Sequence, residues 1–184
     1  SVDKNPIVLK LNNALPGAVL EVRRFGRSNV LSIWVENQCI RKVGGILLLD
    51  PVCKLNWLEN LSIVEFEKVL VATYFLRSTV TDTVLLLRAS VVPQSPDAKV
   101  FLPSVRSLWT TAIPLEDEAE EMFGVQFQTE GKDEDLVRDK KLPPMWEGFP
   151  LRKNYLFPKS FLGIEHSRPL NPLSSRTLVK KLET

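Results

Sequence analysis

Three runs of strand-forming residues, 52–66, 68–77 and 83–92, constrain the fold of this 184-residue chain more than any other feature. They are rich in Val, Ile, Leu, Phe and Tyr, and turn-prone residues such as Ser78 and Asp82 stand between them. Short connections of this kind join antiparallel neighbours. We therefore predict that the three runs form strands of one antiparallel sheet.

The residues before this region predict a hairpin and a short helix. Apolar and polar residues alternate over 18–24 and 29–36, and Gly, Arg and Ser at 26–28 favour a turn between them. Residues 37–49 carry apolar side chains at near-helical spacing, although the glycine pair at 44–45 weakens a helix by about 1 kcal/mol per glycine. We expect the helix to be short for that reason.

A second helix is predicted over Pro114–Gly124. Proline suits a first helical position, acidic residues suit the first turn, and Gly124 suits the position where a helix stops. Apolar residues at i, i+4, i+7 and i+8 from Leu115 form one stripe that should pack on the sheet. The order of elements predicts an α+β fold, with an antiparallel or mixed sheet and one or two helices on one face.

The acidic residues of this second helix form the densest carboxylate cluster of the chain. A pair of carboxylates can catalyse acid–base chemistry or bind a cation, but no calcium-loop pattern is present and successive helical residues point in different directions. We therefore expect a solvated or partner-facing helix surface made by Glu116, Asp117, Glu118, Glu120 and Glu121.

The chain changes character after the α+β domain, which we assign to residues 1–127. Residues 129–141 are strongly charged and predict an exposed loop. Residues 142–184 combine prolines with aromatic residues, so they should form an extended arm that buries its aromatic side chains against something. We assign the whole segment 128–184 to this C-terminal arm.

Composition excludes several functional classes. A net charge of +2, from 24 basic and 22 acidic residues, argues against nucleic-acid binding, and no apolar run is long enough for a direct membrane span. Cys39, Cys53 and His166 are too few to hold an iron–sulfur cluster or a structural zinc, which need about four ligands. The two cysteines are expected as buried thiols. No nucleotide-binding or nucleophile-elbow motif occurs, so we expect no catalytic, cofactor-binding or metal-binding residue.

Two segments resemble the signatures of the 30 kDa subunit family of respiratory complex I, the NADH:ubiquinone oxidoreductase subunit 9 type. Residues 116–125 are similar to the pattern E-R-E-x-x-D-[LM]-[FY]-G-[IV], with Asp117 in place of Arg and Glu121 in place of Asp. Residues 146–155 are similar to W-x-G-x-P-L-R-K-D-[YF] at every position except Asn154. The resemblance runs from about residue 52 to 155 and indicates a divergent member.

The resemblance implies a cofactor-free structural subunit of the peripheral arm of NADH:quinone oxidoreductase. Such a subunit packs on a large 49 kDa-type subunit near the quinone site, while FMN, iron–sulfur clusters and quinone belong to neighbouring subunits. It lies on the matrix side of the mitochondrial inner membrane or the cytoplasmic side of a bacterial membrane. The motif positions expected at the partner interface are Glu116, Glu118, Phe123, Gly124, Trp146, Gly148, Pro150, Leu151, Arg152, Lys153 and Tyr155.

Within this set, Arg152 is expected to pair with a carboxylate of the partner, and the alternative is that the motif folds back on the sheet of its own chain. The departure at Asp117 puts one interface ion pair in doubt. Two other functions stay open: the equivalent subunit of a membrane-bound hydrogenase or ferredoxin-fed ion-pumping complex, and a free-standing small-molecule enzyme. The second of these lacks any recognisable motif.

Overall fold

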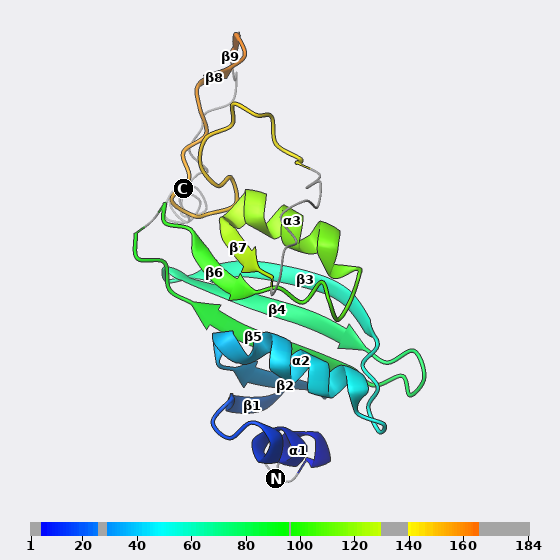
Figure 1. The fold of residues 1–184 in the computed structure, drawn as a ribbon. Helices are drawn as coiled ribbons and strands as arrows, with labels where there is room; N and C mark the ends of the chain where they lie inside the picture. Colours follow the sequence, from blue (N-terminus) through cyan, green and yellow to red (C-terminus); the bar gives the residue numbers. More distant parts are fainter. Residues whose placement is uncertain (1–4, 26–28, 96, 130–139, 166–184) are drawn as a thin grey trace, which may run out of the picture.

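A five-stranded sheet forms the centre of the molecule. The structure is a computed structural model that describes residues 5–25, 29–95, 97–129 and 140–165. The sheet has the order β1-β2-β5-β4-β3 and is antiparallel except for the parallel pair β2–β5 (Figure 1). Its strands are β1 (Val19–Phe25), β2 (Val30–Val35), β3 (Trp57–Phe66), β4 (Val69–Arg77) and β5 (Val84–Val91).

The predicted hairpin and the three predicted antiparallel strands are confirmed. β1 pairs with β2, and β3, β4 and β5 follow one another as neighbours. The first of the three runs begins at Trp57 rather than at residue 52, because the residues after Asp50 form a turn. The carboxylate of Asp50 holds that turn by accepting hydrogen bonds from the backbone N–H groups of Val52 and Cys53, at 2.8 and 3.0 Å.

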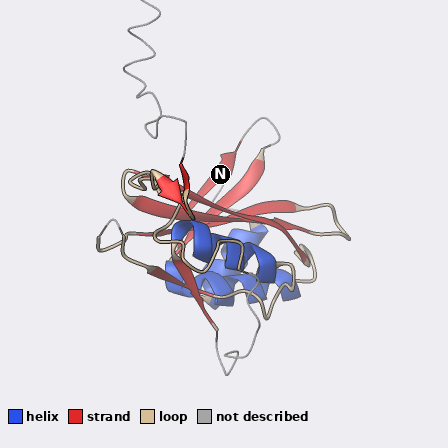
Figure 2. Cartoon of the chain, turned by 90° about the horizontal axis from the view of Figure 1, so that it is seen from above, coloured by secondary structure: helices blue, strands red, loops and turns tan. Residues whose placement is uncertain are grey.

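The helices lie on one side of the sheet, as Figure 2 shows. The predicted short helix is confirmed as a 3-10 turn, Asn37–Cys39, followed by α2 (Ile40–Leu49). The second predicted helix is α3 (Ala112–Phe123); it starts two residues before Pro114 and ends, as expected, at Gly124, which has a φ of 68°. An N-terminal helix, α1 (Pro6–Ala14), was not expected from the sequence.

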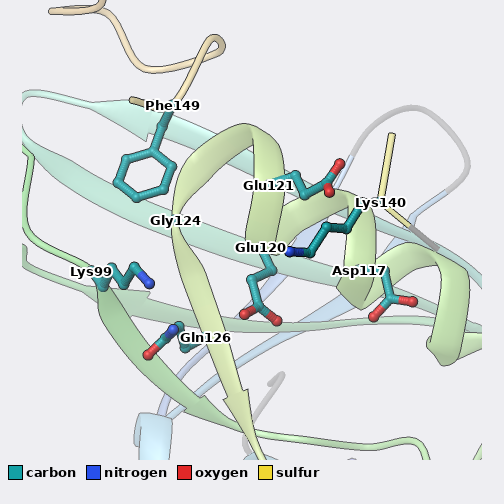
Figure 3. Close-up of a pocket in the computed structure, with 8 residues that line it drawn as sticks. All are labelled: Lys99, Asp117, Glu120, Glu121, Gly124, Gln126, Lys140 and Phe149. Atoms are coloured by element: carbon teal, nitrogen blue, oxygen red, sulfur yellow. The ribbon is translucent and has the colours of Figure 1, made fainter. Parts of the chain in front are cut away.

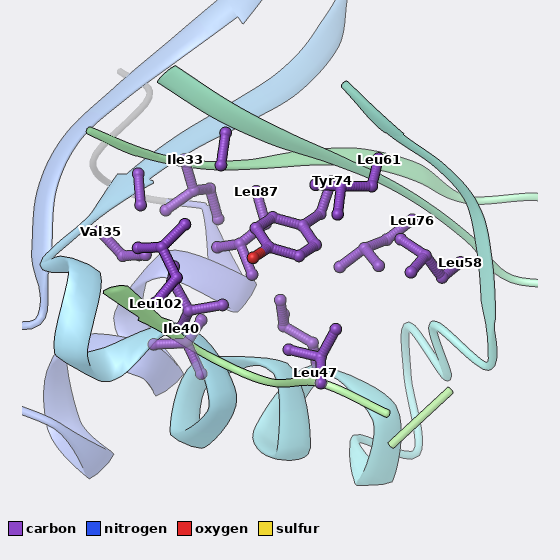
Figure 4. Close-up of a cluster of buried hydrophobic side chains, with 14 of the residues drawn as sticks. Ile33, Val35, Ile40, Leu47, Leu58, Leu61, Tyr74, Leu76, Leu87 and Leu102 are labelled. Carbon is purple, nitrogen blue, oxygen red and sulfur yellow. The ribbon is translucent and has the colours of Figure 1, made fainter. Parts of the chain in front are cut away.

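The hydrophobic core fills the space between the sheet and the helices (Figure 4). Tyr74, Ile33 and Leu87 of the sheet are fully buried opposite Ile40 and Leu47 of α2. Helix α1 adds Val8 and Leu11 to the same core. The observed architecture confirms the α+β class.

Close packing explains one glycine of the pair at 44–45. A Cβ at Gly44 would lie 2.9 Å from Cδ1 of Leu108 and 3.0 Å from the ring of Trp109. The indole N–H of Trp109 donates to the carbonyl of Leu55 at 3.0 Å, which fixes the loop before α3 against the core. Gly44 therefore weakens α2 locally but leaves room for Leu108 and Trp109 to pack on the helix.

Two short parallel strands complete the covered side of the sheet. β6 (Val100–Pro103) and β7 (Val125–Gln128) flank α3 in the sequence and pair in parallel. Val100, Leu102, Val125 and Phe127 belong to the core. In the arm, β8 (Ser160–Phe161) and β9 (Ile164–Glu165) form a minimal antiparallel pair.

The remaining expectations concern the thiols, the charged loop and the membrane. Cys53 is buried, Cys39 is half-buried, and both are free thiols. Most of the predicted loop at 129–141, and His166 with the end of the arm, lie outside the described residues. Over the described residues, no helix has the length and apolar character that crossing a bilayer requires.

Candidate partner-binding site

The first family-like segment contains a buried ion-pair network. Arg106, in the loop after β6, donates from Nε to Oε2 of Glu116 at 2.7 Å and from Nη2 to Oδ1 of Asp117 at 2.5 Å. Glu116 also accepts hydrogen bonds from the hydroxyl of Ser104 and the backbone N–H of Val105, both at 2.8 Å. The network thus fixes the start of α3 to the end of β6.

The burial of this network corrects the prediction of a solvated acidic face. Glu116 is fully buried and Asp117 is 6% exposed, whereas Glu118 is exposed. Burial raises the pKa of Glu116, against the opposing effect of its hydrogen bonds. Burial alone would lower the pKa of Arg106, but its bonds to the two carboxylates raise it. The uncommon Asp117 therefore has an ion-pair partner within its own chain.

Arg152 anchors the second family-like segment to the body of the molecule. Its Nε donates to the carbonyl of Phe123 at 2.7 Å and its Nη2 to the carbonyl of Ala98 at 2.6 Å. The guanidinium lies over the ring of Phe149, with Cζ 4.7 Å from the centroid. Arg152 is 4% exposed. These donors serve carbonyl groups of its own chain, as in the alternative that the motif folds back, and pairing with a partner carboxylate stays a prediction.

Phe149 fits against the glycine that ends α3. A Cβ at Gly124 would lie 2.5 Å from Cε2 and Cζ of Phe149, so only glycine leaves room for the ring. The backbone N–H of Leu151 donates to the carbonyl of Met122 at 3.1 Å, directly beside this contact. The left-handed helix end, the ring and the arm backbone therefore form one packed unit.

Two carboxylates hold the arm on either side of this unit. Glu121 of α3 accepts from the backbone N–H groups of Lys141 and Leu142, at 2.6 and 3.0 Å. Glu65 of β3 accepts from the backbone N–H of Lys153 at 2.7 Å. The arm is thereby tied to α3 before Trp146 and to the sheet after Arg152.

An aromatic cluster lies on the arm beyond these ties. Trp146 stacks on Tyr155 at 6.3 Å between centroids, and Phe161 is 5.1 Å from Trp146. Phe157 contacts both Trp146 and Tyr155 edge-on. A Cβ at Gly148, whose φ is 80°, would lie 2.8 Å from the Tyr155 ring. The arm therefore folds on its own aromatic residues.

Around this cluster the arm exposes large apolar side chains. Leu156 is 80% exposed, and the others range from 46% to 72%. We call this set the arm surface: Met145, Leu151, Leu156, Phe157, Leu162 and Ile164. Figure 1 shows that the arm projects beyond α3 and β7, away from the core. Clustered exposed apolar groups of this kind mark interaction sites.

A cleft of about 320 Å³ separates the end of α3 from the arm (Figure 3). Its lining mixes three carboxylates with two lysines: Asp117, Glu120, Glu121, Lys99 and Lys140, together with Gly124, Gln126 and Phe149. The carboxylates point in different directions (Figure 3), and no group of three or more metal-ligating residues occurs in the described part of the chain. The cleft does not present charge of one sign to a ligand.

The structure thus separates the motif residues into three places. Phe123, Gly124 and Arg152 meet at the end of α3, and Trp146 lies with Tyr155 in the aromatic cluster. Glu116 is buried at the start of α3, while Glu118 is exposed on that helix. Pro150 and Leu151 lie between Phe149 and Arg152 at the end of α3, and the backbone N–H of Lys153 bonds to Glu65 of β3. Arg106 and Phe149 were missed as functional positions, because their contacts depend on packing between distant segments.

Comparison with known proteins assigns the chain to a family. Residues 33–160 match the family described as the respiratory-chain NADH dehydrogenase, 30 kDa subunit. The chain belongs to this family. The match begins in the middle of β2, at Ile33, so it starts nearer the N-terminus than the resemblance over 52–155. It ends within β8 of the arm.

Two bacterial proteins are similar to this chain over most of its length. The C-type subunit of NADH-quinone oxidoreductase from Roseiflexus sp. (strain RS-1) is 31% identical over 157 residues, which cover 84% of each chain. The protein of the same description from Trichlorobacter lovleyi is 26% identical over 153 residues, covering 83% of this chain and 90% of the relative.

A solved structure shares the fold of this family member. It is a chain of the membrane-bound sulfane sulfur reductase (MBS), described as an archaeal respiratory membrane complex. The TM-score is 0.53 at 20% identity, over 73% of this chain and 76% of the other. At this identity the likeness supports the fold alone.

Proposed function

We propose that this chain is a structural subunit of the peripheral arm of NADH:quinone oxidoreductase. The observation that carries the proposal is its membership of the 30 kDa subunit family over residues 33–160. The subunit would lie on the cytoplasmic side of a bacterial membrane, or on the matrix side of the mitochondrial inner membrane. The bacterial relatives favour the first of these locations.

The arm surface is the proposed docking site for the large 49 kDa-type subunit near the quinone site. The carbonyl bonds of Arg152 and the packing of Phe149 hold the base of the arm. The apolar side chains beyond that base are exposed. Binding costs less free energy when the contacting segment is already ordered, so an anchored arm suits docking better than a loose one.

The residues that make the proposed contact differ from those expected from the sequence. Arg152 positions the arm, and the apolar residues around the aromatic cluster make the contact. Leu151, Trp146 and Tyr155 stay part of the proposed interface, and the exposure of Leu151, at 53%, and the half-buried state of both rings support this. Aromatic residues that are partly covered before docking are typical anchors of protein interfaces.

Paired substitutions test this docking site. Leu156→Gln with Leu162→Gln removes apolar side chains that are 80% and 70% exposed. Leu49→Gln with Val52→Gln is the matched control, because these side chains are 81% and 63% exposed at the end of α2 and in the turn after it, in the body of the protein. Tagged chains are expressed in the native cells, and the associated subunits are quantified by mass spectrometry.

The arm variant should lose at least about tenfold of its associated large subunit, while the control stays near wild type. A tenfold change corresponds to about 1.4 kcal/mol, within the range of a few interface residues. Both variants should melt within about 2 °C of the wild type, because exposed side chains contribute little to stability. Equal recovery of the large subunit with both variants would remove the arm surface from the interface.

We also propose that the chain itself holds no redox cofactor. Two cysteines and one histidine in the whole sequence cannot supply the usual ligands of an iron–sulfur cluster. The chain expressed alone should show no visible absorption band and no stoichiometric iron or zinc. A stoichiometric iron–sulfur spectrum would refute this part of the proposal. FMN, iron–sulfur clusters and quinone are expected in neighbouring subunits.

A second candidate function is the equivalent subunit of a membrane-bound hydrogenase or another ferredoxin-fed ion-pumping complex. The shared fold with a chain of the archaeal sulfane sulfur reductase complex favours keeping this alternative. The subunits recovered with the tagged wild-type chain distinguish the two. A flavin- and nicotinamide-binding subunit selects NADH:quinone oxidoreductase, and a nickel-site large subunit without it selects the alternative.

A further inference from the structure

The side of the sheet opposite the helices is a broad apolar face. We call it the open face, and Figure 2 shows it on the far side of the sheet from all the helices. Its apolar side chains alternate with core residues along the five strands, and several are well exposed, including Phe66 at 62% and Phe25 at 58%. They are Phe25, Val30, Trp34, Trp57, Val64, Phe66, Val69, Val71, Phe75, Val84 and Leu86.

Arg88 lies in the middle of this face on β5. The strand register places it between Trp34 of β2 and Thr73 of β4. Its guanidinium carbon is 5.2 Å from the ring centroid of Phe25 and 5.6 Å from that of Trp34. The charge is therefore held by two aromatic rings at the surface of the sheet.

Arg88 differs from Arg23 and Arg77, the other arginines of the open face, because no carboxylate of the described residues pairs with it. Arg23 pairs with Glu21, and Arg77 pairs with Asp82 at 2.6 Å and with Glu59 at 3.7 Å. Among the residues that the structure describes, Arg88 forms no ion pair, and its Nε is buried without a hydrogen-bond acceptor. A buried donor without an acceptor is unfavourable, so a partner that brings an acceptor to Arg88 lowers the free energy of the complex.

A second unsatisfied polar atom lies on the same face. Ser32 is 1% exposed, and its hydroxyl oxygen makes no hydrogen bond with the described residues. The register places it beside Leu86, two residues along β2 from Trp34. Two neighbouring buried polar groups without partners are unusual, because natural proteins satisfy most such groups.

We propose that the open face is a second docking surface, for an apolar segment of a neighbouring subunit that carries one Asp or Glu for Arg88. This inference rests on the proposed function, in which the chain is a subunit of a larger complex. The carboxylate would accept from the Arg88 guanidinium, and the apolar flanks of the segment would cover Phe25, Trp34 and Phe75. Apolar surroundings exclude water and strengthen such a charge-assisted bond.

The charges on the open face argue against two other occupants. A second copy of this chain placed face to face would bring one unpaired Arg88 toward the other, and like charges disfavour that contact. An anionic lipid surface attracts groups of free basic residues, whereas Arg23 and Arg77 already have carboxylate partners. One unpaired arginine among apolar residues fits a protein segment with one acidic residue.

Substitution of Arg88 with a matched control tests the proposal. Arg88→Leu removes the unpaired charge, and Arg77→Leu removes a charge from the same face that has partners within the chain. Each tagged variant is purified with its complex from the native cells, and its subunits are quantified. We expect Arg88→Leu to lower the recovery of one neighbouring subunit at least about tenfold. The free chain should melt within about 2 °C of wild type, and Arg77→Leu should assemble normally.

Photo-crosslinking identifies what covers the open face. p-Benzoylphenylalanine in place of Phe25 should cross-link, in the purified complex, to a segment of another subunit that contains an Asp or Glu. Exchanging the charges, with Arg88→Glu in this chain and Arg at the acidic position in the partner, should restore the assembly that Arg88→Glu alone abolishes. This rescue would not follow from a general loss of folding.

The outcomes separate this inference from the proposed function. If the tagged wild-type chain recovers no other subunits, the proposed function fails. If the wild-type chain assembles and Arg88→Leu assembles equally well, only the docking of the open face is overturned. A cross-link from position 25 to a second copy of the chain, to lipid alone or to a segment without an acidic residue also overturns it.

Discussion

The ring of Phe149 occupies the space that any side chain at position 124 would need. Gly124 has a φ of 68°, and a Cβ there would lie 2.5 Å from two ring atoms of Phe149. The glycine therefore ends α3 and also receives the arm. The end of α3 and the arm, which residues 129–141 separate in the sequence, therefore pack against each other at this point.

Substitution of Gly124 should cost more than its backbone conformation alone explains. Gly17 is a natural control, because its φ is 80° and a Cβ there would meet nothing within 4 Å. We expect Gly17→Ala to lower the free energy of unfolding by about 1 kcal/mol, the cost of a left-handed alanine. Gly124→Ala should cost about 2–3 kcal/mol, because overpacking adds to that strain.

Chemical denaturation of the free subunit measures both losses. In a Phe149→Ala background, Gly124→Ala should cost no more than Gly17→Ala, since the ring is gone. If Gly124→Ala and Gly17→Ala lower the free energy of unfolding equally in the wild-type background, the contact with Phe149 adds nothing to the cost of a side chain at position 124.

Loss of Arg152 should destabilise the free subunit. Arg152→Ala removes two hydrogen bonds to the carbonyls of Phe123 and Ala98 and the contact with Phe149. Bonds from charged donors contribute about 1.5–3 kcal/mol each, so we expect a loss of about 2 kcal/mol or more. Lys153→Ala, at the exposed neighbouring position, should change stability by less than about 0.5 kcal/mol. Lost assembly with an unchanged melting temperature would return Arg152 to the partner interface.

Neutralising Glu116 should disrupt the buried network at the start of α3. Glu116→Gln leaves the Arg106 guanidinium, which is 9% exposed, with one carboxylate instead of two. Breaking a buried pair typically costs about 3–5 kcal/mol, and the surviving bond to Asp117 should limit the loss to about 3 kcal/mol. Glu118→Gln on the exposed side of the helix is the control. Equal unfolding midpoints in urea for the two variants would contradict the assigned network.

Asp50 should make stability depend on pH in the acid range. Burial alone would raise the pKa of Asp50, but hydrogen bonds from Lys10, Cys53 and Val52 hold that pKa well below its usual value. A lowered carboxyl pKa stabilises the fold above the unfolded value of about 4, and this contribution is lost as the pH falls below that value.

Asp50→Asn should therefore lower the free energy of unfolding by about 2 kcal/mol at pH 7. The difference between wild type and variant should shrink progressively below about pH 4. Urea denaturation of both proteins between pH 7 and pH 2.5 measures the two curves. A constant difference over that range would show that the charge of Asp50 is not involved.

Local patterns in the sequence were sufficient to predict most of the sheet and both central helices. Period-two alternation identified β1 and β2, and runs of strand-forming residues separated by turn residues identified β3 to β5, because these signals act between neighbours in the chain. Gly124 identified the end of α3 through its backbone conformation. Helix α1 was missed although Asn5 and Pro6 are a local signal for a helix start. Only the burial of Val8 and Leu11, in a core made mostly by later segments, could not be predicted from its own sequence.

The errors at the candidate site arose from contacts between distant segments. The carboxylate of Glu116 is buried because Arg106, ten residues away, lies against it, and no local pattern predicts that pair. Arg152 reaches Ala98 across an even longer stretch of chain. The motif at 146–155 indicated which residues matter, but only the fold shows that Arg152 acts inside its own chain while Leu151 faces outward.

The place of β5 between β2 and β4 has a consequence for biosynthesis. Leu31 of β2 pairs with Leu85 of β5, so the N-terminal hairpin meets its neighbour only after β3, β4 and β5 have left the ribosome. The meander of β3 to β5 forms from contacts that are close in the sequence and should assemble first. Until then the edge of β2 that pairs with β5 stays unpaired, and an unpaired apolar edge of this kind promotes aggregation of the incomplete chain.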